Sequence, residues 1–289
     1  MKRPGRVVDA HVHLWDPART DWYPYLSGQR DVGLGDVTGM ARRFDVATHR
    51  VESAGWNVEK LVNVAAAVGG HSIDETLELD RRADAEGGPA AIVGGLPRAN
   101  TIGETEAIDL IDRQMAAARF RGVRAMGTPG RPLPTAHVLR ALQDRGLVFE
   151  LMIHPDELLT AARDLGSFPD VVVVVEHTGW PRSDSGEERA LWLEGMGALA
   201  DLGGNVHCKL SGLAMPLGSI SAEAFAPWIE PAIEAFGVGR CFFASNFPVD
   251  GMHGTFDQLY TAYAEVTAEL DDDARDRLFA SNAERVYRC

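Results

Sequence analysis

Cysteine is scarce in this chain of 289 residues, and long hydrophobic runs are absent. The three cysteines, Cys208, Cys241 and Cys289, are far apart and form no Cys-x-x-Cys pair. This excludes a disulfide framework and predicts a reducing compartment, the cytoplasm. No run of about 18 apolar residues is present, so no membrane-spanning helix is expected. The basic first residues precede no apolar segment of the kind found in secretion signals.

Positive charge is also in short supply, with 28 Lys and Arg residues against 42 Asp and Glu residues and a net charge of −14. Nucleic acids and anionic membranes bind basic surfaces, so neither is an expected partner. A small anion held by local arginines remains compatible with this balance. We therefore expect a small-molecule substrate. A homodimer is the expected oligomeric state only because dimers are common.

Apolar residues make up 45% of the chain, and eight short runs are especially rich in them. These runs, at 6–14, 60–66, 91–96, 120–126, 148–154, 171–177, 205–213 and 241–249, alternate with stretches of helical composition. Near-continuous apolar strands that alternate with helices predict a parallel sheet covered on both faces. The length fits one (β/α)8 TIM barrel over residues 1–289. A doubly wound open sheet is the alternative, but no Gly-rich phosphate loop follows the first run.

The first apolar run, VVDAHVHLWD, carries two histidines one residue apart. Alternate side chains of a strand share a face, which places Asp9, His11 and His13 together. Two neutral imidazoles at that spacing can share a divalent cation, or they can donate hydrogen bonds to a carbonyl oxygen. The alternative is a pair of core histidines that hydrogen-bond to their neighbours.

Polar side chains stand at the carboxyl ends of the later runs, where active sites of barrels lie. We expect these groups to converge on His11 and His13: Arg124, His154, His177, Lys209, Ser211, Asn246 and Asp250. Arg124, Lys209, Ser211 and His154 are interpreted as substrate contacts. Because Asp9, Glu150, Arg124 and Lys209 can all point into the barrel, a purely structural charge network is the alternative for them.

Aromatic residues are concentrated in the longest connection, residues 15–59, which contains TDWYPYL. In a barrel this connection leaves the carboxyl end of the first strand. Trp15 and Tyr25 are therefore candidates to stack on a ring-shaped substrate. Trp180, three residues after His177, is a further candidate. Alternatively, the aromatic residues of the connection fold back and pack against the barrel.

Four motifs resemble one known family: DAHVH at 9–13, EHTGWP at 176–181, CKLSG at 208–212 and ASNFPVD at 244–250. Together they resemble the amidohydrolase superfamily, in the branch with 2-pyrone-4,6-dicarboxylate lactonase and the L-fucono- and L-rhamnono-lactone hydrolases. The resemblance implies a (β/α)8 barrel that hydrolyses a cyclic ester. It implies His11, His13 and His177 as metal ligands. One divalent ion, zinc or manganese, or no metal at all, is expected, because Arg124 occupies the strand that usually supplies a further ligand.

One position departs from the pattern of the superfamily. Asn246 stands where most members have an aspartate that takes a proton from water, and an amide is no base at neutral pH. His177 or Asp250 is then the candidate base, with Asn246 beside them. The expected function is opening of a lactone by water. A metal-dependent decarboxylase of an aromatic or enoic acid, or an impaired barrel that only binds a small molecule, is the alternative.

Overall fold

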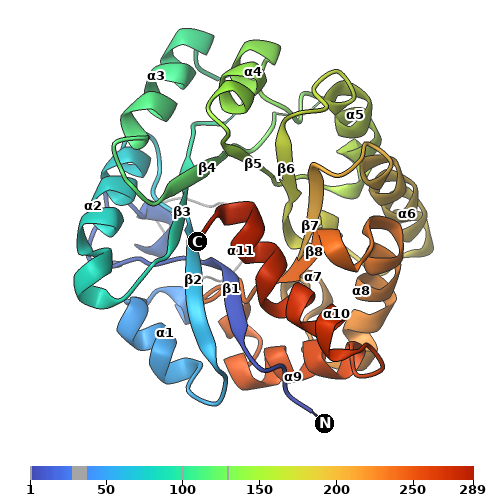
Figure 1. Ribbon diagram of the computed structural model, residues 1–289. Helices are drawn as coiled ribbons and strands as arrows, with labels where there is room; N and C mark the ends of the chain where they lie inside the picture. Colours follow the sequence, from blue (N-terminus) through green and yellow to red (C-terminus); the bar gives the residue numbers. More distant parts are fainter. Residues whose placement is uncertain (1, 28–37, 99–100, 129) are drawn as a thin grey trace.

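Eight parallel strands follow one another in sequence order around a nearly closed barrel (Figure 1). The computed structural model describes residues 2–27, 38–98, 101–128 and 130–289. The strands are β1 Val7–Val12, β2 Val58–Val64, β3 Ala91–Gly95, β4 Phe120–Arg124, β5 Val148–Leu151, β6 Val172–Val175, β7 Val206–Leu210 and β8 Cys241–Phe243. A bridge between Val12 and Phe247 joins the last strand's connection to β1. The predicted (β/α)8 barrel is confirmed.

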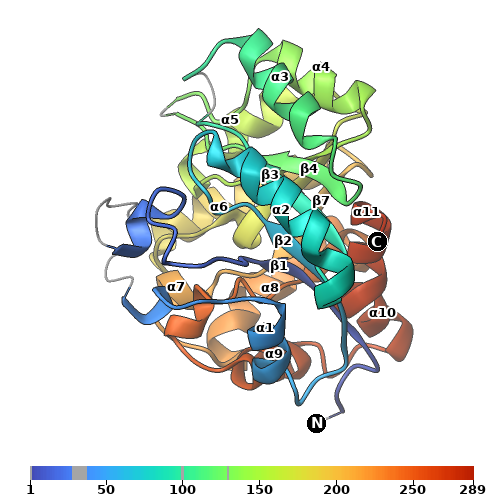
Figure 2. The same cartoon turned by 90° about the vertical axis from the view of Figure 1, so that its left-hand side faces the viewer.

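Helices surround the ring of strands, as both ribbon views show (Figures 1 and 2). They are α1 Val46–Glu52, α2 His71–Glu86, α3 Glu104–Gln114, α4 Ala136–Asp144, α5 Pro155–Leu165, α6 Gly186–Ala200, α7 Ala214–Leu217, α8 Ala222–Phe236, α9 Phe256–Val266, α10 Asp272–Asp276 and α11 Asn282–Tyr287. Among the described residues, no helix combines the length and apolarity needed to cross a bilayer.

The inside of the barrel is apolar at the end where the strands begin. A buried cluster there joins residues of several strands with α11: Val8, Val62, Ala91, Val148, Val174, Phe242, Ala283 and Tyr287. Figure 1 shows α11, in red, lying across the middle of the ring of strands. Because α11 covers this end, the opposite end, where the strands finish, is left for a functional site.

The strand that carries the two histidines is irregular. Asp9 pairs with Leu61 of β2 and Val12 pairs with Asn63, so β1 holds one residue more than its partner over this stretch. Such a bulge resets the alternation of side chains. The carboxylate of Asp9 therefore faces α1, where its Oδ2 lies 2.8 Å from Nε2 of His49. The prediction that Asp9 shares a face with His11 and His13, and points into the barrel, is wrong.

Several strands end earlier than the apolar runs predicted. β5 ends at Leu151, β6 at Val175 and β8 at Phe243. His154, His177 and Asn246 consequently lie in the turns that follow these strands. Their directions are set by turn geometry rather than by strand alternation.

Candidate active site

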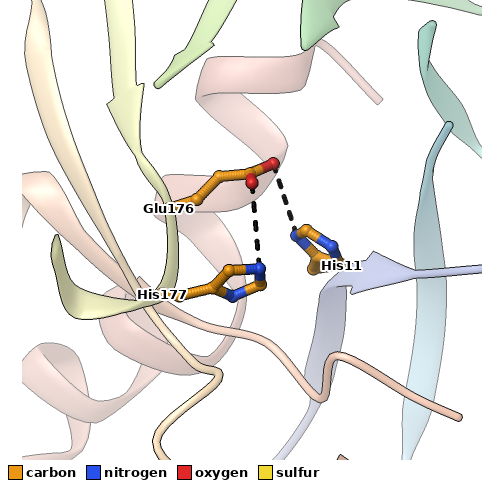
Figure 3. Close-up of side chains that lie close together, drawn as sticks. All are labelled: His11, Glu176 and His177. Carbon is orange, nitrogen blue, oxygen red and sulfur yellow. Dashed lines mark ion pairs between the residues drawn. The ribbon is translucent and has the colours of Figure 1, made fainter. Parts of the chain in front are cut away.

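His11, Glu176 and His177 meet at the mouth of the barrel (Figure 3). His11 comes from β1, whereas Glu176 and His177 follow directly after β6. Oε1 of Glu176 lies 3.8 Å from Nδ1 of His11, and Oε2 lies 3.8 Å from Nε2 of His177. The centroids of the two imidazole rings are 4.7 Å apart. All three side chains are buried.

His13 completes a hydrogen-bonded pair with His11. Nδ1 of His13 lies 2.8 Å from the carbonyl oxygen of Val64, and a carbonyl only accepts, so this nitrogen carries the ring hydrogen. Burial lowers the pKa of both His11 and His13 well below the usual value, so each ring is neutral and has one hydrogen. The two Nε2 atoms are 3.2 Å apart, and the bare Nε2 of His13 must accept from His11. His11 is thus a donor through Nε2.

A left-handed turn presents His177 to the site. His177, Thr178 and Trp180 have φ angles of 53°, 55° and 38°, a region that side chains other than glycine rarely adopt. The indole nitrogen of Trp192 donates to the Thr178 carbonyl at 2.7 Å. The hydroxyl of Ser211 hydrogen-bonds Nδ1 of His177 at 3.1 Å. Backbone strain of this kind persists where surrounding contacts enforce it, and it is concentrated at functional sites.

The group of His11, Glu176 and His177 fits a divalent cation by its chemistry. Its ligand atoms all lie within 4.8 Å of one another. Burial, as the largest cause, lowers the pKa of His177 as well, so both imidazoles are neutral, the form that binds metal. Within the described part of the chain, neither carboxylate oxygen of Glu176 has a hydrogen-bond partner. Glu176 takes the third place that the sequence assigned to His13, whose role as a ligand stays a prediction.

Asn246 and Asp250 form the second polar pair of the site. Nδ2 of Asn246 donates to Oδ1 of Asp250 at 2.9 Å, and the backbone nitrogen of Asn246 donates to the His11 carbonyl at 2.9 Å. Asn246 has a φ of 55°, a conformation that asparagine tolerates better than most residues. Burial raises the pKa of Asp250 to about 7, against the lowering effect of the Asn246 amide. A carboxyl with that pKa is poised to exchange protons at neutral pH.

The three other polar residues expected to bind substrate lie at different depths. The side chain of Arg124 is 17% exposed, and its Nη1 lies 3.6 Å from Oε2 of Glu176. Lys209 is fully buried and forms an ion pair with Glu150 at 2.8 Å. Ser211 is buried against His177. Arg124 can reach a ligand from its position, whereas Lys209 and Ser211 contact the histidines, and their direct binding of substrate stays a prediction.

His154 and Trp180 line an open cleft of about 550 Å³ beside these groups. Their rings stack with centroids 4.6 Å apart, and the Trp180 ring is 6.0 Å from that of His177. Arg98, Met152 and Arg182 also line the cleft. A substrate that extends beyond the histidines would enter this space.

Trp15 and Tyr25 pack inward. The ring of Trp15 stacks on His13 at 5.5 Å, and its indole nitrogen donates to the carbonyl of Arg42. The hydroxyl of Tyr25 donates to the carbonyl of Ala66. Both are buried, as the packing alternative expected, and their contact with substrate stays a prediction. Residues 28–37 of the connection at 15–59 lie outside the described residues.

Sequence reasoning assigned no role to Glu176, although it is quoted within the EHTGWP motif. Its signal was present, because Glu176 immediately precedes His177 and is a charged residue at the end of a run of valines. Trp192 and Gly212 also support His177, but nothing in the sequence connected them to it. A Cβ at Gly212 would lie 2.6 Å from Cγ of His177.

A sequence model of the amidohydrolase family, described as Amidohydrolase, matches residues 8–289. The chain is 33% identical to the uncharacterized protein y4mH of Sinorhizobium fredii, over 98% of each chain. It is 26% identical to L-fucono-1,5-lactonase of Burkholderia ambifaria, over 97% of this chain and 95% of that protein.

The fold is shared with solved structures. A crystal structure of an amidohydrolase from Burkholderia multivorans with bound zinc superposes with a TM-score of 0.78 at 22% identity. The likeness covers 98% of this chain and 99% of that one.

Proposed function

The chain belongs to the amidohydrolase family, and on that premise we propose that it opens a lactone ring by attack of water on the ring carbonyl. The observation that carries this proposal is the meeting of His11, a hydrogen-bond donor, with His177 at the barrel mouth, while Asp250 has a pKa of about 7. Similarity to an L-fucono-1,5-lactonase supports a sugar lactone as the substrate, and a carboxylated cyclic ester is the alternative.

Each group has a distinct part in the proposed reaction. Without a metal, Nε2–H of His11 would leave Nε2 of His13 and donate to the carbonyl oxygen as negative charge develops on it, which is the contribution of an oxyanion hole. His177 or Asp250 takes the proton from the attacking water, and Asn246 orients the Asp250 carboxylate. Alternatively, a divalent ion held by His11, Glu176 and His177, with His13 as a further candidate ligand, would replace the hydrogen bond from His11 and polarise the carbonyl or acidify water.

Acid release from a panel of sugar lactones and carboxylated cyclic esters tests the proposal. The purified protein is assayed beside a His177→Asn variant, and its metal content is measured on the same sample. The proposal expects turnover of at least one lactone by the wild type and loss of that turnover in the variant. A wild type that opens no lactone in the panel would contradict it.

Arg124→Ala should raise KM for the preferred lactone about tenfold while kcat changes little. Arg124 is a partly exposed cation beside Glu176, and the loss of a charge-assisted hydrogen bond that is equal in ground and transition states affects KM alone. Steady-state kinetics check this, with Arg145→Ala as the control, because Arg145 pairs with Asp112 on the outer surface. An unchanged KM for every accepted substrate would remove Arg124 from substrate binding.

Gly212→Ala should lower kcat by roughly tenfold to a hundredfold, because displacement of a catalytic group by about 1 Å has effects of this size. The new Cβ would press on the His177 ring, and Gly212 already has a φ of +68°. Gly218→Ala is the matched control, since Gly218 has a φ of +60° and open space around its Cβ position. Equal kcat values for the two variants would show that backbone strain, and not the displaced ring, explains the loss.

Location and oligomeric state are two further proposals. We propose that the protein lies in the cytoplasm, as its low cysteine content suggests, and that it forms a homodimer, a common state of enzymes. Light scattering of the purified protein measures the mass of the assembly against the 31.3 kDa of the single chain.

A further inference from the structure

The open cleft of about 550 Å³ continues outward from the proposed active site. Trp180 lines it, and the Trp180 ring lies 6.0 Å from that of His177. Met152 lines it as well, and its sulfur lies 4.0 Å from Nη1 of Arg124. Pockets of roughly 300–1,000 Å³ accommodate drug-sized ligands, so this cleft has room for more than one small ring. A substituent on a lactone ring held at His177 would enter it.

His154 gives the cleft a hydrogen-bond acceptor in a fixed place. It directly precedes α5, and its Nδ1 lies 3.0 Å from the carbonyl oxygen of Trp180. A carbonyl only accepts, so Nδ1 carries the ring hydrogen, and Nε2 of the neutral imidazole is an acceptor. A hydroxyl group of a ligand in the cleft can donate to this nitrogen.

The rings of His154 and Trp180 together form a flat aromatic surface in the cleft. Their planes are within 26° of parallel, their centroids are 4.6 Å apart, and both residues are partly exposed. The face of an aromatic ring is electron-rich and attracts polarised C–H groups. A sugar ring presents such C–H groups on its faces and hydroxyl groups around its edge, so it suits an aromatic surface with polar groups beside it.

The charges around the cleft cancel. Among the described residues that line it, two are cations and two are carboxylates: Arg98, Arg182, Asp156 and Glu157. Nη2 of Arg182 pairs with Oδ1 of Asp156 at 2.9 Å, and Nη1 of Arg98 donates to the carbonyl of Gly127 at 2.7 Å. The cleft therefore offers both donors and acceptors, which hydroxyl groups need, without the excess of positive charge that would select an anion.

We propose that this cleft is a subsite for a neutral glycosyl substituent of the lactone, in which Trp180 stacks on the sugar ring and Nε2 of His154 accepts a hydrogen bond from one of its hydroxyls. The inference rests on the proposed function and names its substrate class, a lactone that carries a second sugar ring rather than a second carboxylate. It is tested by binding of the opened acids, so its failure is distinguishable from a failure to hydrolyse lactones.

Calorimetry with three kinds of sugar acid tests the proposal on the full-length protein. Aldonates (gluconate and galactonate) correspond to single-ring lactones after opening. Aldobionates (lactobionate, cellobionate and maltobionate) add a neutral glycosyl group, whereas aldarates (glucarate and galactarate) add a carboxylate. The proteins compared are the wild type, His154→Asn and Trp180→Leu. The asparagine amide nitrogen can replace Nδ1 as donor to the Trp180 carbonyl, but asparagine has no counterpart of Nε2.

Trp22→Leu and His71→Asn are the matched controls. Trp22 also stacks on a histidine, His71, with ring centroids 5.7 Å apart. Trp22 lines a different hollow, beside Arg19 and Glu78. Both controls should therefore keep the wild-type preference among the three kinds of acid. Circular dichroism shows which variants are folded.

The best aldobionate should bind the wild type about tenfold more tightly than the best aldonate or aldarate, which is the size of effect expected from one hydrogen bond and one stacking contact. His154→Asn should reduce this preference about fivefold, and Trp180→Leu should abolish it. Stronger binding of an aldarate, equal binding of the three kinds, or binding of none would overturn the proposal. So would a preference that survives in folded His154→Asn, which decides alone if Trp180→Leu does not fold.

Discussion

Replacement of Asp250 by asparagine should reduce kcat/KM by about 10²–10⁴-fold, the usual contribution of a general base. Burial raises the pKa of this carboxyl from 3.8 to about 7, so the carboxylate that can take a proton forms only as the pH rises through neutrality. Wild-type kcat/KM should therefore rise with pH and level off above about pH 7, where the carboxyl is ionised. An unshifted carboxyl would instead leave the rate flat down to about pH 4.

A pH series of kcat/KM for the wild type, Asp250→Asn and Asp273→Asn measures this effect. Asp273 lies on α10, is exposed and is remote from the site, so its variant should follow the wild-type profile. The Asp250→Asn variant should have a low kcat/KM that no longer rises with pH near pH 7. If Asp250→Asn keeps most of the activity, the base must be another group, with His177 the first candidate.

Replacement of Asn246 by aspartate should lower turnover at neutral pH by roughly 10–100-fold and move the acid limb of the profile to higher pH. The Asn246 amide now donates to Oδ1 of Asp250 at 2.9 Å. A carboxylate in its place would remove the donor and put a like charge beside Asp250, so one proton would be held by the pair to higher pH. Restoring the residue typical of the superfamily should thus harm this site.

Asn246→Gly separates the loss of the hydrogen-bond donor from the addition of a like charge. Glycine keeps the positive φ of this position and removes the donor without adding charge. Its acid limb should move less than that of Asn246→Asp. The opposite pattern is a gain of activity in Asn246→Asp together with a silent Asp250→Asn. That pattern would mean that Asp250 is not the base, and that Asn246 only occupies the place of the aspartate base found in most of the superfamily.

The barrel was predictable from sequence because most strand residues are buried on both faces, and the resulting apolar runs differ in composition from the helices between them. The order of the strands followed from the same alternation. His11, Arg124 and His177 were identifiable because polar groups at the carboxyl end of an apolar run have few structural reasons to be there. The four motifs then indicated the family.

Side-chain directions that depend on a bulge or a turn could not be predicted from the alternation of residues along a strand. The extra residue in β1 turns Asp9 toward His49. A bulge is defined by the pairing of two strands, so the sequence pattern of β1 alone does not reveal it. The left-handed turn after β6 orients His177, although Thr178 and Trp180 carry no signal for positive φ. The depth of Lys209 depends on Glu150 and Tyr287, which lie 59 and 78 positions away in sequence, and only the closed barrel brings them together.

Hydrolysis of the preferred lactone in ¹⁸O-labelled water tests the central claim most directly. If water attacks the ring carbonyl, mass spectrometry of the product should show one heavy oxygen in the new carboxylate and none in the released hydroxyl, with a rate that His177→Asn abolishes. A product without heavy oxygen in the carboxylate would contradict the account. So would a protein that opens no lactone and instead releases carbon dioxide from an aromatic or enoic acid.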